Sequence, residues 1–154
     1  DEAFAVLLAD DLILNSPSCT EQLIEAYQKT NSTVIGLNKV PEEETNKYGV
    51  ISSDDIDSSL NTFQLNDIVE KPEKNPPSNL AVVGRYILSA KIFNYLENLQ
   101  PSVGGEVQLT DAIKLMLADE QVYGHIYEGQ KFDCGSRHGY VQAIAHLAPG
   151  VLGE

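Results

Sequence analysis

Two adjacent carboxylates, Asp10 and Asp11, follow a short apolar run near the start of the chain. The run, residues 4–8, predicts a strand buried on both faces, because short unbroken apolar runs are typical of sheet interiors. Open α/β sheets bind ligands at the carboxyl ends of their strands, so these aspartates are candidates for a ligand or metal site. Alternatively, both cap the next turn, a position that aspartate favours. Successive side chains of an extended chain point in opposite directions, so at most one faces a crevice, and Asp10 is our candidate.

The elements that must position these carboxylates alternate along the chain. Further strands are expected at 33–40, 48–52, 63–68, 79–88 and 121–129. The most regular helical pattern is at 109–118, where apolar residues recur at the spacing of one helix face. Strands alternating with helices predict an α/β fold with a mostly parallel, mixed sheet flanked by helices.

Helix caps mark where other helices begin. Ser18 and Glu21 have the spacing of a capping box, and Ser89 and Ser136 can cap two later helices. For the last helix we expect a core face made of Tyr140, Val141, Ile144 and Leu147.

Composition limits the class of protein. A chain of 154 residues with 42% apolar residues can bury one core, so we expect a single α/β domain over residues 1–154. The net charge of −13 argues against nucleic acid and anionic membranes as partners, and no apolar run is long enough to span a bilayer. Cys19 and Cys134 form no Cys-x-x-Cys pair, so we expect reduced thiols and a cytoplasmic protein.

Six segments resemble bacterial UTP–glucose-1-phosphate uridylyltransferases (UDP-glucose pyrophosphorylases), which are sugar nucleotidyltransferases. They occur in that family's order and at roughly its spacing: LLADDLI, KYGVI, IVEKP, SNLAVVGRYIL, GGEVQLTDAI and FDCGSRHGY. The resemblance implies a partial nucleotide-diphospho-sugar transferase (Rossmann-like) fold. It also implies transfer of UMP from UTP to glucose 1-phosphate, giving UDP-glucose and pyrophosphate, with Mg²⁺ as cofactor.

The resemblance assigns a metal role to two aspartates. It implies that Asp10 binds Mg²⁺ and is catalytic, and that Asp133 of the DCG motif lies beside it as a second metal ligand. Two carboxylates about 5 Å apart repel by roughly 3 kcal/mol at an effective dielectric near 20, and a shared cation relieves that repulsion. Without the resemblance, Asp133 would be interpreted as a turn carboxylate that caps the last helix.

The same resemblance assigns residues to the sugar phosphate. It implies that Glu70 binds glucose hydroxyls and that Lys71 binds the phosphate and is catalytic. A carboxylate accepts hydrogen bonds from two hydroxyls, and an ammonium neutralises phosphate charge. Being neighbours on a strand, the two should diverge; alternatively they are a common exposed ion pair. The resemblance also places Gly49, Val82 and Gly84 against the sugar, although either glycine alone is more often a turn or packing requirement.

The chain departs from the family at its amino end. The Gly-rich loop that cradles the nucleotide phosphates has no counterpart, and Ala9 stands where the family usually has proline. We therefore expect an amino-terminally truncated chain that carries the sugar-phosphate and metal part and is inactive by itself. The alternative is a truncated homologue that acts as a sugar-phosphate-binding or assembly module. Because the first strand would expose an unpaired edge, we also expect a homodimer that covers it.

Overall fold

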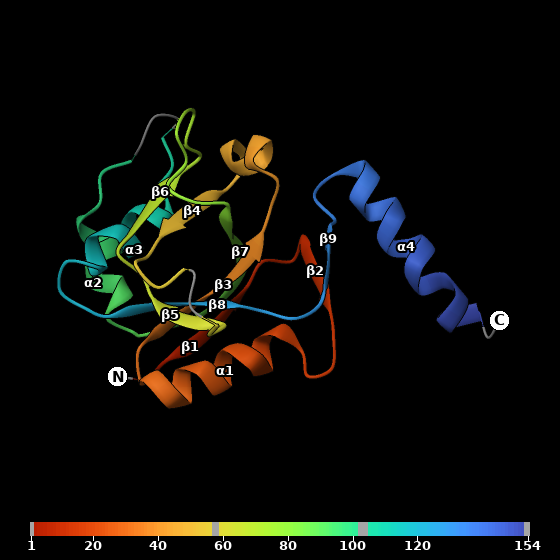
Figure 1. Ribbon diagram of the computed structural model, residues 1–154, viewed down its shortest axis with the longest axis horizontal. Helices are drawn as coiled ribbons and strands as arrows, with labels where there is room; N and C mark the ends of the chain where they lie inside the picture. The colour runs from red at the N-terminus through yellow and green to blue at the C-terminus, as the bar shows by residue number, and fades with distance from the viewer. Residues whose placement is uncertain (1, 57–58, 102–104, 153–154) are drawn as a thin grey trace.

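The computed structural model describes residues 2–56, 59–101 and 105–152. Gly104, the first residue matched in the GGEVQLTDAI segment, lies outside these ranges. The described chain forms a mixed α/β fold in which a seven-stranded sheet is flanked by helices (Figure 1). A separate two-stranded ribbon leads to a final helix that extends away from this body. The α/β prediction is therefore confirmed.

The elements follow one another in an order close to the predicted one. The strands are β1 (Phe4–Leu7), β2 (Asp11–Leu14), β3 (Thr33–Lys39), β4 (Gly49–Ser52), β5 (Thr62–Gln64), β6 (Asp67–Glu70), β7 (Leu80–Leu88), β8 (Val122–Ile126) and β9 (Gln130–Asp133). The helices are α1 (Cys19–Thr30), the 3₁₀ helix η1 (Glu42–Lys47), α2 (Ile92–Asn98), α3 (Leu109–Met116) and α4 (Arg137–Leu152). Among the described residues, no helix combines the length and apolar character needed to cross a membrane.

Strand direction differs from the prediction. The sheet order is β5-β8-β3-β7-β4-β6, with β1 also paired to β7, and β2 pairs with β9 in the ribbon. Of the described pairings only β3–β8 is parallel, so the sheet is mixed but not mostly parallel. The long central strand β7 runs antiparallel to β1, β3 and β4. Continuous apolar runs report that both faces of a strand are covered, and they carry no information about its direction.

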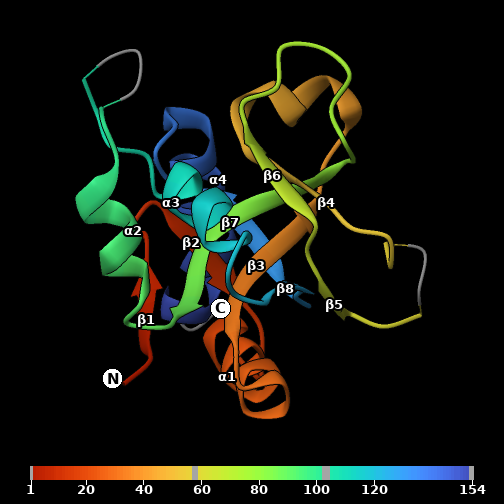
Figure 2. The same cartoon turned by 90° about the vertical axis from the view of Figure 1, so that its left-hand side faces the viewer.

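Two apolar cores lie on opposite faces of the sheet. On β3, Val34 packs toward α1, whereas Ile35 and Leu37 belong to the core that contains residues of α2 and α3. Figures 1 and 2 show α1 along one face and α2 and α3 against the other. The alternation of side chains along a strand therefore divides a single apolar segment between two helical layers.

Two of the three predicted helix caps are confirmed. Ser18 and Glu21 form the complete capping box of α1, in which each side chain accepts from the other's backbone N–H. Ser136 caps α4, since its hydroxyl accepts a 3.0 Å hydrogen bond from Gly139 N. The prediction that Ser89 caps α2 is wrong: Lys91 is the N-cap residue and no side chain caps this helix, although the Ser89 hydroxyl accepts a 3.3 Å hydrogen bond from Lys91 N just before it.

Two burial predictions are wrong. β1 is only partly buried, and Leu7 and Leu8 are 53% and 46% exposed. The predicted core face of α4 is exposed: Tyr140, Val141, Ile144 and Leu147 face outward, while Ala143 is buried. Apolar periodicity identifies a helix face that suits burial, but it does not show that the described chain supplies a partner for that face.

Three strand assignments also change. The strand predicted at 63–68 divides into β5, which pairs with β8, and β6, which pairs with β4. The ribbon strands β2 and β9 have no counterpart in the prediction. Each has only four residues, too few for a clear periodicity, and they form by pairing between distant parts of the chain.

Candidate functional site

One cavity contains every residue predicted for binding or catalysis. It has a volume of about 510 Å³ and lies where β1, β4, β6 and β9 approach β7 and the start of α3. Its lining includes Asp10, Gly49, Glu70, Lys71, Val82, Gly84 and Asp133. The fold thus brings together seven residues from distant segments of the sequence, between positions 10 and 133.

Asp10 and Asp133 meet at one end of this cavity. Asp10 lies in the turn between β1 and β2, and its carbonyl accepts a 2.7 Å hydrogen bond from Cys134 N. In the ribbon, Asp11 pairs directly with Asp133. Oδ2 of Asp10 and Oδ1 of Asp133 each lie 3.2 Å from the point that a Cβ on Gly135 would occupy. The two oxygens are therefore no more than twice that distance apart, and both carboxylates border the space beside Gly135.

Oxygen ligands of this kind suit a hard divalent cation. No group of three or more His, Cys, Asp or Glu side chains with metal-binding geometry occurs in the described part of the chain. Two carboxylates alone leave several positions of a Mg²⁺ coordination shell for phosphate oxygens or water, which is usual where the ion bridges a phosphorylated substrate.

The prediction that at most one of the adjacent aspartates, Asp10 and Asp11, faces a crevice is wrong. Both line the cavity, because Asp10 is in a turn and the alternation of an extended strand does not apply there. Oδ1 of Asp11 lies 2.9 Å from Lys131 Nζ, and Oδ2 accepts a 2.7 Å hydrogen bond from Gly84 N. Asp11 therefore fastens the ribbon to β7.

Lys131 is a cavity residue that the sequence analysis missed. Its side chain is 13% exposed and that of its partner Asp11 is 14% exposed. Its Nζ also lies 5.0 Å from the centroid of the Tyr48 ring, within cation–π range. The available signal was its position two residues before Asp133, which places both side chains on the same side of an extended strand.

Glu70 and Lys71 form the other end of the cavity, and they do not diverge as expected. Lys71 Nζ lies 3.7 Å from Glu70 Oε1, and both residues line the same cavity. Lys71 follows β6 with a φ of 45°, so the regular alternation of the strand stops at this residue. Thr110, also missed, donates a 2.8 Å hydrogen bond to Glu70 Oε2 from α3.

The two candidate glycines have different surroundings. A Cβ on Gly84 would lie 2.5 Å from Leu8 Cβ, so the close approach of the segment after β1 to β7 requires glycine there. At Gly49 the nearest atom is Glu70 Oε2, at 3.2 Å. Packing alone accounts for Gly84, whereas Gly49 borders a polar group of the cavity. Val82 adds a half-buried apolar side chain to the lining.

Comparison with known proteins supports the resemblance found in the six sequence segments. The model of the family described as nucleotidyl transferase matches residues 1–149. This chain belongs to the nucleotidyl transferase family. It is 44% identical over 146 residues to a UTP–glucose-1-phosphate uridylyltransferase of Pseudomonas aeruginosa, covering 93% of this chain and 52% of the relative. It is 43% identical over 149 residues to the enzyme of that name from Bacillus subtilis, covering 96% and 50%.

Solved structures give the same result. A UDP-glucose pyrophosphorylase complexed with UDP-glucose has a TM-score of 0.90 and 37% identity, covering 97% of this chain and 57% of that one. A UTP-bound enzyme of this type from Acinetobacter baumannii has a TM-score of 0.81 and 36% identity, covering 97% and 52%. The likeness to these enzymes predicted from the six segments is confirmed. The chain spans about half the length of the curated relatives it matches.

Arg85 holds the carboxylate turn of this nucleotidyl transferase chain in place. Its guanidinium donates hydrogen bonds to the carbonyls of Leu8, Gly84 and Asp11. All three acceptors are main-chain oxygens, so the rigid planar donor set of arginine braces the β1–β2 turn against β7.

The environment of the cavity changes the pKa of Tyr86, which is one of its lining residues. Burial, with smaller contributions from the charges of Asp11 and Glu70, raises the pKa of Tyr86 to about 12. The phenol therefore stays protonated at neutral pH and can serve there as a hydrogen-bond donor.

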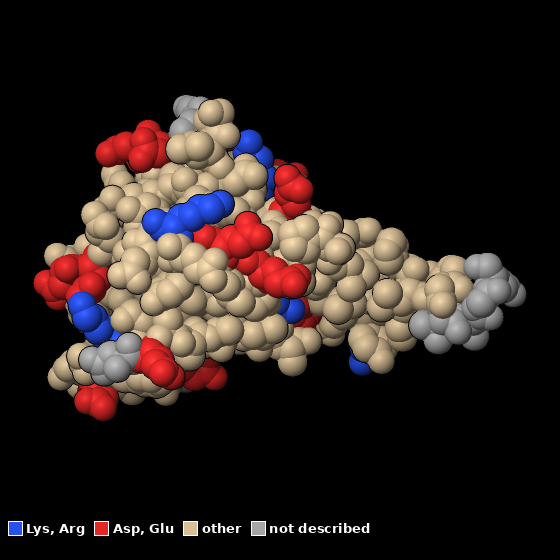
Figure 3. Space-filling model, turned by 90° about the horizontal axis from the view of Figure 1, so that it is seen from below, with Lys and Arg blue, Asp and Glu red and all other residues tan. Residues whose placement is uncertain are grey.

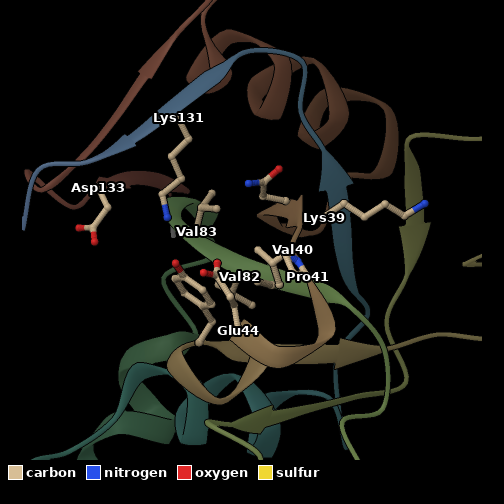
Figure 4. A pocket seen from close by; sticks show the side chains of 11 residues that line it. Lys39, Val40, Pro41, Glu44, Val82, Val83, Lys131 and Asp133 are labelled. Atoms are coloured by element: carbon tan, nitrogen blue, oxygen red, sulfur yellow. The ribbon is translucent and has the colours of Figure 1, made fainter. Parts of the chain in front are cut away.

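A smaller cavity of about 220 Å³ adjoins the first. The two share Tyr48, Val82, Val83, Lys131 and Asp133. Figure 4 shows Lys131 and Asp133 extending from the same strand, while Lys39 points away from them. Lys131 therefore lies at the junction of the two spaces in the nucleotidyl transferase chain.

The surface is predominantly acidic, as the net charge of −13 requires. On the face shown in Figure 3, the described Lys and Arg side chains are separated by acidic and uncharged residues and form no continuous basic patch. Any anionic ligand would therefore have to be held by local cations, and the main cavity contains Lys47, Lys71 and Lys131.

Proposed function

We propose that this chain carries the sugar-phosphate and metal part of a UTP–glucose-1-phosphate uridylyltransferase. In that reaction UMP is transferred from UTP to glucose 1-phosphate, giving UDP-glucose and pyrophosphate. The observation that carries the proposal is the single 510 Å³ cavity with two carboxylates at one end and Glu70 and Lys71 at the other. The relatives named for this activity, at 43% and 44% identity, support it.

At the metal end, Asp10 and Asp133 would hold Mg²⁺. When bound, such an ion neutralises phosphate charge and polarises the phosphoryl group that is attacked. The contribution of the chain is to keep the two carboxylates at a fixed separation through the Cys134–Asp10 hydrogen bond and the Asp11–Asp133 pairing.

At the sugar end, Glu70 would accept hydrogen bonds from glucose hydroxyls, and Lys71 would pair with the phosphate. Thr110 orients the Glu70 carboxylate by donating to Oε2, which leaves Oε1 toward Lys71. Gly49, Val82 and Gly84 would line the sugar, with Val82 against its apolar face. Binding in this way would put the sugar phosphate between Lys71 and the two carboxylates Asp10 and Asp133.

The alternative function is a sugar-phosphate-binding or assembly module that forms a homodimer. Two observations favour assembly: β1 pairs only with β7 among the described strands, and α4 exposes four large apolar side chains. Unpaired strand edges and exposed apolar faces are the usual contacts of such assemblies. A cytoplasmic location belongs to both proposals, because UTP and sugar phosphates are intracellular metabolites.

Titration calorimetry tests the binding proposal directly. Glucose 1-phosphate is added to this chain with and without Mg²⁺, and pyrophosphate release is then measured after UTP is supplied. Mg²⁺-dependent binding supports the sugar-phosphate role, and pyrophosphate release extends it to turnover. If no ligand binds, the binding proposal is wrong and assembly remains.

Sedimentation velocity over a range of micromolar concentrations tests the assembly proposal. A dimer that dissociates when Leu147 is replaced by glutamate would support an interface through α4. A monomer at every concentration would contradict it.

A further inference from the structure

Three carboxylates crowd one end of the cavity, and one of them is already engaged. Asp11 lies opposite Asp133 in the ribbon and directly follows Asp10. Both of its oxygens have partners, Lys131 Nζ at 2.9 Å and Gly84 N at 2.7 Å. In the described part of the chain, neither Asp10 nor Asp133 forms an ion pair. Asp11 is thus a neutralised carboxylate, whereas Asp10 and Asp133 have no cationic partner among the described residues.

Lys131 is positioned to maintain this separation. It is largely buried, and its two neighbours, the Asp11 carboxylate and the Tyr48 ring, fix its ammonium from different sides. Tyr48 in turn accepts a 2.9 Å hydrogen bond from Lys71 N through its carbonyl. A short chain of contacts therefore runs from Asp11 through Lys131 and Tyr48 to Lys71, the residue proposed to bind phosphate.

We propose that Lys131 is a positioning residue, which draws Asp11 away from the metal site and cancels its charge beside the bound sugar phosphate. This inference rests on the proposed function. Without Lys131, the freed Asp11 carboxylate would add a third negative charge where the substrate brings its own. A metal cation would then be attracted more strongly, and an anionic sugar phosphate would be repelled.

The experiment measures two affinities that should change in opposite directions. Mn²⁺ alone and glucose 1-phosphate with Mg²⁺ are titrated separately into the wild-type chain and into Lys131→Met. We expect the variant to bind the metal about threefold more tightly and the sugar phosphate about tenfold more weakly. Lys131→Arg, which keeps the charge, should bind both ligands as the wild type does.

Two further variants separate positioning from other roles. In the double variant Lys131→Met with Asp11→Asn, both affinities should return to near wild-type values, because the charge balance is restored. Lys91→Met is the matched control, since it removes the same charge and breaks an ion pair with Glu120 outside the cavity. It should leave both affinities unchanged.

Three results would overturn the proposal. Lys131→Met could match the Lys91→Met control in both titrations, its two affinities could fall together, or the double variant could stay as weak as the single one. The last result would assign Lys131 to direct contact with the phosphate.

If the wild-type chain binds no glucose 1-phosphate, the proposed function fails, and the Mn²⁺ titration still tests the role of Lys131. If Lys131→Met does not fold, Asp11→Asn alone should weaken metal binding and strengthen sugar-phosphate binding, and the reverse contradicts the proposal.

Discussion

The backbone N–H of Cys134 donates a 2.7 Å hydrogen bond to the carbonyl oxygen of Asp10. This bond joins the turn that carries the first candidate metal ligand to the strand end that carries the second. The backbone thus fixes the relative position of the two residues, and Asp133 Oδ1 also accepts a 3.1 Å hydrogen bond from Gly135 N.

If the two carboxylates share a Mg²⁺ ion, neutralising either one should weaken Mg²⁺-dependent binding of glucose 1-phosphate. For Asp10→Asn and for Asp133→Asn we expect a loss of at least about tenfold, since each removes one charged ligand. Calorimetry with and without Mg²⁺ measures it. Asp54→Asn, which removes the same charge in an exposed turn, is the control. Equal affinity in all three variants would exclude a shared ion.

Alanine substitutions at the two cavity glycines should give opposite patterns. Gly84→Ala brings a Cβ within 2.5 Å of Leu8 Cβ, so the unfolding free energy should fall by about 1–3 kcal/mol. Gly49→Ala meets the end of the Glu70 side chain at 3.2 Å and the Thr110 side chain at an ordinary 3.5 Å, so stability should change little while glucose 1-phosphate affinity falls. Urea denaturation and calorimetry check the two effects. An unchanged denaturation midpoint for Gly84→Ala would show that β1 can move without cost.

Thr110 should influence sugar binding through Glu70. Thr110→Val keeps the shape of the side chain but removes the 2.8 Å hydrogen bond to Glu70 Oε2. Because a hydrogen bond to a charged group contributes about 1.5–3 kcal/mol, glucose 1-phosphate affinity should fall by about tenfold or more. Thr110→Ser retains the hydroxyl and should bind as the wild type does. A Thr110→Ser variant as weak as Thr110→Val would point to the lost methyl group instead.

His125 should make the fold less stable in mild acid. Burial is the main cause that lowers the pKa of His125 below its ordinary value, and its Nδ1 lies 2.7 Å from Thr62 Oγ1. Above pH of about 6.5 both folded and unfolded states are neutral at this residue. As the pH falls below that value the unfolded chain takes up the proton first, so stability is lost.

The substitution His125→Gln should therefore reduce the drop in unfolding free energy between about pH 7.5 and about pH 5.5. Urea denaturation at both values measures this drop. His138→Gln, at an exposed position in α4, is the control. If the two variants lose stability equally with falling pH, His125 does not contribute to the effect.

The sequence was sufficient for features that depend on local patterns. The capping box at Ser18, the helix at Leu109–Met116 and the buried strand Leu80–Leu88 follow from spacing within a few residues. Strand direction, by contrast, depends on how distant segments pair. Burial also depends on distant segments. The apolar spacing in α4 correctly predicted a helix, but it did not predict that its apolar face would be exposed.

For the site, resemblance and pattern gave different kinds of information. The motif residues were correctly expected to lie near one another, and the structure places Asp10 and Asp133 at one cavity. The position of Lys131 two residues before Asp133 indicated the same side of a strand, but its contact with Asp11 across the ribbon depends on pairing between distant segments. Thr110 was missed for the same reason, since it reaches Glu70 from a helix distant in sequence.

Gly139 shows how little space separates the last helix from the candidate site. A Cβ at this position would lie 2.1 Å from the carbonyl oxygen of Asp133, closer than any real contact. The lack of a side chain at Gly139 thus allows α4 to pack directly against the backbone of Asp133. A substitution there would displace a candidate metal ligand without changing the chemistry of its side chain, so screens limited to polar residues would overlook it.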